Sequence, residues 1–160
     1  GGISDWGTIC GALYGAAAAY ALFWGRKERD PMVTELYRWY EQTALPIYQP
    51  GDMAQGVKGD IPSNPSGSVL CHISVSKWCY NTKLPASGKE RSERCGRITA
   101  DVSRKAVEIF NAKIDAGKDW KGASRRLSGI AANAIPRVAN PISPRVLWTA
   151  RPVTAARNIP

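Results

Sequence analysis

One stretch, residues 85–120, constrains the fold of this chain more than any other, because it predicts a single long amphipathic helix. Apolar side chains recur along one helical face, at Cys95, Ile98, Val102, Ala106, Ile109 and Phe110. Ser87 and Glu90 predict a capping box at the start of the helix, and Gly117 predicts its end. A helix of about 28 residues spans roughly 42 Å. The pattern therefore favours a helical architecture in which other helices cover this face.

Two further helices are predicted in the first part of the chain. Residues 8–24 form an apolar stretch with Thr8 as a possible N-cap and Gly25 just past its end. The segment RDPMVTELYRWYEQ predicts a second helix, with Asp30 as N-cap and Pro31 as its first residue. Both helices agree with an all-α fold.

The rest of the chain divides into a loop, a short helix and an arm. Residues 43–68 are rich in Pro and Gly and predict a long loop, after which Ser74 can cap a short helix that runs to about residue 81. We therefore expect an all-α, irregular helical bundle with a long Pro/Gly-rich loop and an extended C-terminal arm. The predicted units are a helical, cysteine-containing redox domain over residues 1–120 and a basic, Pro-rich arm over residues 121–160.

The charge distribution supports the division between domain and arm. The whole chain carries a net charge of +9, and residues 121–160 contain seven Lys or Arg, no Asp or Glu and five prolines. Ile142, Leu147 and Trp148 make this segment too apolar for a solvated tail. We expect it to lie along an acidic protein partner, such as a multihaem cytochrome, with a second copy of this chain as the other option.

Several function classes are disfavoured by the sequence. The chain has no phosphate-binding loop, and its single histidine and four cysteines exhaust the usual nucleophile–base choices, so we predict no catalytic residue and no stand-alone enzyme. The scattered arginines lack a nucleic-acid-binding motif. The longest apolar stretch, residues 9–24, is marginal for crossing a bilayer, so we expect no transmembrane segment.

The four cysteines are the candidate metal ligands. They lack the C-x-x-C pairing of most zinc sites and redox dithiols, and the C-x-x-C-H motif of covalent haem is absent, so His72 is read as a structural residue. Two interpretations remain open: a structural one, with two disulfides or with buried free thiols that pack as small apolar side chains, and one four-thiolate site. If Cys71 and Cys79 lay within one helix, they would stand about 12 Å apart along its axis. A shared site therefore needs Cys71 to precede the helix that Ser74 caps.

Three stretches together resemble a known family. GGISDWGTICGALYGA, LCHISVSKWC and KERSERCGRITADVSRKAVEIFN are similar to the cysteine-containing segments of the C-GCAxxF-C-C redox family, in particular its branch with the split-Soret cytochromes c. The resemblance covers roughly residues 1–25 and 66–115. It implies an exported, helical redox protein with a [2Fe-2S] cluster. The family's cysteines map by similarity onto Cys10, Cys71, Cys79 and Cys95. The C-x-x-C-H haem motif of the branch is missing here, which implies no covalent haem in this chain. The helical segment that precedes the first cysteine block in the family is missing as well, which implies an incomplete N-terminus.

The resemblance makes the cluster the preferred interpretation. We predict an electron-transfer or redox accessory subunit that binds a [2Fe-2S]-type cluster through Cys10, Cys71, Cys79 and Cys95 and docks on a cytochrome or another redox partner. The alternative is a structural or assembly subunit with two disulfides, Cys10–Cys95 and Cys71–Cys79 or another pairing. We expect a periplasmic or otherwise exported location, reached by the twin-arginine route.

Overall fold

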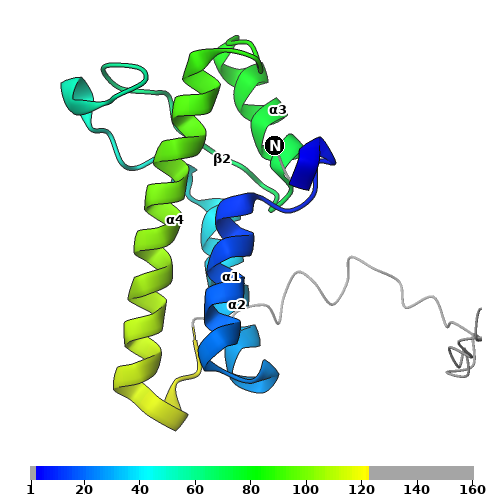
Figure 1. The fold of residues 1–160 in the computed structure, drawn as a ribbon, viewed down its shortest axis with the longest axis vertical. Coiled ribbons are helices and arrows are strands. Elements are labelled where there is room, and N and C mark those ends of the chain that lie inside the picture. Colours follow the sequence, from blue (N-terminus) through cyan, green and yellow to red (C-terminus); the bar gives the residue numbers. More distant parts are fainter. Residues whose placement is uncertain (1–2, 123–160) are drawn as a thin grey trace, which may run out of the picture. The chain divides into compact units, whose positions relative to one another are not determined.

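The computed structural model describes residues 3–122 and confirms a mostly helical fold (Figure 1). In chain order its elements are η1 (Ile3–Asp5), α1 (Gly11–Phe23), α2 (Arg26–Gln42), β1 (Ala44–Leu45), η2 (Gly51–Met53), β2 (Asn64–Pro65), α3 (Cys71–Thr82), α4 (Lys89–Ala116) and η3 (Gly117–Asp119). Apart from residues 121 and 122, the predicted arm lies outside the described residues. No helix within residues 3–122 is long and apolar enough to cross a membrane.

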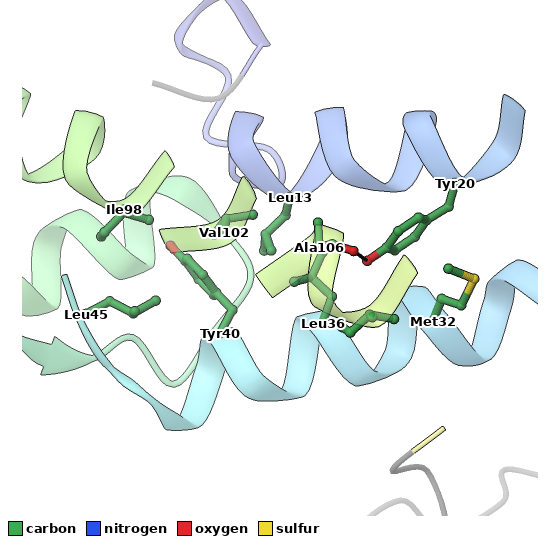
Figure 2. Packing of buried hydrophobic residues seen from close by; sticks show 10 residues of the cluster. Leu13, Tyr20, Met32, Leu36, Tyr40, Leu45, Ile98, Val102 and Ala106 are labelled. Carbon is green, nitrogen blue, oxygen red and sulfur yellow. Dashed lines mark hydrogen bonds between the residues drawn. The ribbon is translucent and has the colours of Figure 1, made fainter. Parts of the chain in front are cut away.

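The core lies between α1, α2 and α4, as Figure 2 shows. Its buried side chains are Leu13, Tyr20, Met32, Leu36, Tyr40, Leu45, Ile98, Val102, Ala106 and Ile109. The Tyr20 hydroxyl donates a hydrogen bond of 2.9 Å to the Ala106 carbonyl, which joins α1 to α4. The predicted apolar face of the long helix is thus confirmed, with Phe110 packed against the edge of the core.

The first two helices begin at other residues than predicted. α1 begins at Gly11 instead of Thr8, because residues 8–10 are extended and pair with residues 69–71. α2 begins at Arg26 and runs through Pro31, with Gly25 as its N-cap. A proline inside a helix removes one backbone hydrogen bond. At Pro31 the missing bond is the one to the Lys27 carbonyl, four residues earlier and in the first turn of the helix, so the rest of α2 keeps its ladder.

The last two helices also differ from the prediction at their starts. α3 begins at Cys71 with Leu70 as N-cap, so Ser74 lies inside the helix and is buried instead of capping it. α4 begins at Lys89, and no side chain forms a capping hydrogen bond at its start, so the predicted capping box is absent. The helix ends as predicted at Gly117, whose positive φ of 56° favours glycine.

The long loop between α2 and α3 is fixed by polar contacts with α4. The Asp101 carboxylate accepts the backbone N–H groups of Ile47 (2.7 Å) and Tyr48 (3.0 Å). Arg97 donates to the Val57 carbonyl (2.8 Å). The indole N–H of Trp78 on α3 donates 2.7 Å to the Pro62 carbonyl. β1 and β2 pair antiparallel and close the base of the loop.

Candidate metal centre

Three cysteines from separate parts of the chain line one cavity of about 260 Å³. Cys10 is the N-cap residue of α1, Cys71 is the first residue of α3, and Cys95 lies in the second turn of α4. All three are half-buried, and no disulfide joins the described cysteines. We call this space the cysteine cavity; Tyr40, Ser74, Arg91 and Arg94 contribute most of its polar lining.

Backbone pairing holds Cys10 beside Cys71. The Cys10 N–H donates 2.9 Å to the Val69 carbonyl, and the Cys71 N–H donates 2.9 Å to the Thr8 carbonyl. These two bonds flank the antiparallel bridge between Ile9 and Leu70. Figure 1 shows the N-terminal segment, in blue, lying against the start of α3. The position of Cys10 is therefore set by residues about sixty positions away in the chain.

Gly7 lets the N-terminal segment approach α3 closely. Its φ is +68°, and a Cβ built there would lie 2.7 Å from His72 Nδ1, so both conformation and space favour glycine. His72 is exposed and borders a second cavity of about 330 Å³, whose wall also includes Cys71 and Cys95. The two cysteines are thus reachable from both cavities.

A buried guanidinium faces the cysteine cavity. Arg94 is only 1% exposed; its Nη2 donates 3.0 Å to the Ser74 hydroxyl, while its Nε has no hydrogen-bond partner in the described part of the chain. Its Cζ lies 5.5 Å from the centre of the buried Trp78 ring. Among residues 3–122 no carboxylate forms an ion pair with it. Because arginine stays charged, the cavity contains a positive charge without a counter-charge from this part of the chain.

Tyr40 completes the polar lining. Its hydroxyl donates 3.0 Å to the same Ser74 oxygen that accepts from Arg94. Burial raises the pKa of Tyr40 well above its ordinary value, and the neighbouring Cys10 thiol acts in the same direction. The tyrosine therefore stays neutral, and Arg94 keeps the dominant charge of this group of side chains.

Cys79, the fourth predicted ligand, does not line the cysteine cavity. Cys71 and Cys79 lie within one helix, eight positions apart, which places them about 12 Å apart along the axis and about 80° apart around it. A disulfide needs Cα atoms roughly 4.4–6.8 Å apart, so the predicted Cys71–Cys79 pairing does not fit. Within residues 3–122 no three His, Cys, Asp or Glu side chains stand close enough to hold a single metal ion.

Sequence reasoning missed Arg94, Ser74 and Tyr40. A signal for Arg94 was present, since it stands four residues before Ile98 and therefore on the apolar face of α4. A charged residue on the apolar face of a helix is rarely buried unless another group binds its charge.

The three cysteines of the cavity do not surround a single ion, but an iron–sulfur cluster contains several metal atoms and its thiolate ligands stand further apart, so the lining fits a group of that kind. Thiolates are soft ligands that suit iron–sulfur clusters. A metal–thiolate group is also negatively charged, so it would balance the positive charge of the Arg94 guanidinium. The fold and the cavity therefore define a helical protein in which three cysteines from separate elements line one cavity.

Comparison with known proteins gives the family. Residues 1–109 match the family described as "Putative redox-active protein (C_GCAxxG_C_C)", so the chain belongs to this family. The motif of this family is C_GCAxxG_C_C, so its second segment ends in Gly and the Phe written above for that position is wrong.

The chain is similar in both sequence and structure to the split-Soret cytochrome c of one organism. The chain is 73% identical over 121 residues to the split-Soret cytochrome c of Desulfovibrio desulfuricans, covering 76% of this chain and 43% of that protein. It also resembles a solved structure described as "A novel iron centre in the split-Soret cytochrome c", with a TM-score of 0.77 and 66% identity over 81% of this chain and 54% of that one. The chain thus spans about half the length of these relatives.

Proposed function

We propose that this chain is an electron-transfer or redox accessory unit and that Cys10, Cys71 and Cys95 hold an iron centre of the [2Fe-2S] type. One observation carries the proposal: three cysteines from separate elements line one cavity, which also contains a buried guanidinium that has no carboxylate partner among residues 3–122. The high identity to a cytochrome for which a novel iron centre is described supports iron as the metal.

The chemistry of such a unit is the transfer of one electron at a time. A bound cluster supplies the electron-accepting orbitals, and this chain supplies the surroundings. The three sulfurs bind the metal group, and the backbone pairing at Thr8–Cys10 fixes the spacing between Cys10 and Cys71. Buried Trp78 lies behind the Arg94 guanidinium, and both solvent exclusion and hydrogen bonds near sulfur tune the potential of such a group.

The role of Cys79 separates two versions of the proposal. The sequence-based prediction uses four cysteine ligands, whereas the cavity contains three. For Cys79 to join them, the C-terminal part of α3 would have to unwind or rotate, at the expense of its helical hydrogen bonds. We therefore assign three of the four terminal ligand positions of the cluster to Cys10, Cys71 and Cys95, leave the fourth to a ligand other than cysteine, and expect Cys79 to be dispensable.

The test is the iron and acid-labile sulfide content of protein purified without oxygen. We expect about equal iron and sulfide in the wild type, as a [2Fe-2S] core requires, and a loss of more than tenfold in Cys10→Ser, Cys71→Ser and Cys95→Ser. Cys79→Ser is the matched control and should retain the metal. Iron-free wild type would refute the metal centre, and loss of iron in Cys79→Ser would restore the four-ligand version.

We also propose that the unit docks on a cytochrome through residues 121–160 and acts in an exported compartment. The support is the positive charge of this segment, which contains no acidic residue, together with the cytochrome identity of the relative. Removal of residues 121–160 should leave the iron content unchanged and weaken association with an acidic multihaem cytochrome, with wild-type binding falling as salt rises. Unchanged affinity of the truncated chain would remove the arm from the proposal, and cell fractionation tests the location.

A further inference from the structure

The buried cations of α4 differ in how their charge is compensated. Arg97 is 2% exposed and pairs with Glu93 (2.9 Å), while it also donates to the Val57 carbonyl (2.8 Å). Lys113 is 5% exposed and pairs with Glu28 (3.2 Å). Arg94 alone of these three has an unpartnered nitrogen and no carboxylate among residues 3–122.

The side chains around Arg94 fix its orientation toward the cysteine cavity. Ser74 and Trp78 stand four residues apart on α3 and therefore on one face of that helix, and Cys71 lies one turn before Ser74. The Ser74 oxygen accepts hydrogen bonds from Arg94 and from Tyr40, and the Trp78 ring lies beside the guanidinium. The helix that carries Cys71 thus also positions the charge.

We propose that Arg94 is the counter-charge of the iron centre and sets its reduction potential, an inference that rests on the proposed function. When a one-electron donor reduces the site, no bond forms or breaks and the net charge of the site falls by one. Arginine cannot release its proton, so its positive charge is present in both redox states. In a buried site it stabilises the more negative, reduced state, and its removal lowers the potential.

The test compares three variants by redox titration of the iron-loaded protein. Arg94→Met removes the charge at similar volume, and Arg94→Lys keeps it. Arg104→Met is the matched control, because Arg104 lies ten residues further along α4, about 15 Å by helical rise, with a side chain that is 80% exposed and screened by solvent.

We expect Arg94→Met to decrease the ratio of reduced to oxidised protein at a fixed applied potential by at least tenfold, a shift of about 59 mV for one electron. Arg94→Lys should stay close to the wild type, and Arg104→Met should shift the ratio less than twofold. An Arg94→Met potential that matches that of Arg104→Met would overturn the inference.

Two other outcomes are decisive as well. If circular dichroism shows that Arg94→Met is folded but the variant retains no iron, Arg94→Lys decides. Iron retained by Arg94→Lys supports the charge assignment, and iron lost from Arg94→Lys refutes it. An iron-free wild type defeats the proposed function itself, which separates that failure from the failure of Arg94 to tune the potential.

Discussion

Substitution of Gly7 by Ala tests the segment that places Cys10 beside Cys71. Gly7 has a φ of +68°, and for a residue with a Cβ the left-handed region costs about 1–2 kcal/mol. The new Cβ would also lie 2.7 Å from His72 Nδ1. Because His72 is exposed, its ring can rotate away, so the steric part should be small. We expect a loss of about 1–2 kcal/mol in the free energy of unfolding, dominated by the backbone.

The assay is urea unfolding of the iron-free, fully reduced protein, since a bound metal breaks the two-state assumption. A double-mutant cycle with His72→Ala separates the two causes, because only the steric part disappears in the double variant. Gly15→Ala is the matched control: Gly15 lies within α1 with nothing within 4 Å of an added Cβ, so alanine should stabilise by about 0.5–1 kcal/mol. A Gly7→Ala variant as stable as the wild type would refute the described path of the N-terminal segment.

Two further predictions concern the long loop. Asp101→Ala leaves the backbone N–H groups of Ile47 and Tyr48 without their acceptor, so the free energy of unfolding in urea should fall by about 2–4 kcal/mol. Asp101→Asn should cost about half as much. A loss below about 0.5 kcal/mol in Asp101→Ala would contradict the contact. The hydrogen bond from Arg97 holds the pKa of Glu93 below its ordinary value of 4.5, so the stability that this contact provides is complete above about pH 4.5 and is lost as the pH falls through the lower, folded-state pKa. The stability difference between wild type and Glu93→Gln, measured from pH 7 down to pH 3, should therefore be constant above about pH 4.5 and shrink below it, and a difference that grows on acidification would oppose this.

The long helix could be predicted from the sequence because its signal is local. Ile98, Val102, Ala106 and Ile109 repeat at helical spacing, and the buried face of α4 contains all four. The start of α1 could not be predicted in this way. Residues 8–10 are held by hydrogen bonds to residues 69–71, and such long-range pairing leaves no periodic pattern near Thr8. The end of α4 was predicted correctly because a glycine with positive φ is a local requirement.

The candidate site was predictable in its chemistry and less so in its geometry. Soft ligands were recognisable from the residue types, and three of the four cysteines line one cavity. The prediction that Ser74 caps α3 was wrong, because its hydroxyl is buried and receives hydrogen bonds from Tyr40 and Arg94. As α3 instead begins at Cys71, helical geometry directs Cys79 away from the cavity. The start of this one helix is what separates the proposed three-cysteine site from the four-cysteine site predicted from the sequence, and the iron content of Cys79→Ser tests the difference.

The most direct test of the central claim is anomalous X-ray diffraction at the iron absorption edge, on crystals of the full chain grown without oxygen. The account predicts iron density inside the cysteine cavity, within bonding distance of the Sγ atoms of Cys10, Cys71 and Cys95, with the Arg94 guanidinium facing it. Iron bound at Cys79 and outside the cavity would contradict the account, as would an iron-free cavity closed by a Cys10–Cys95 disulfide.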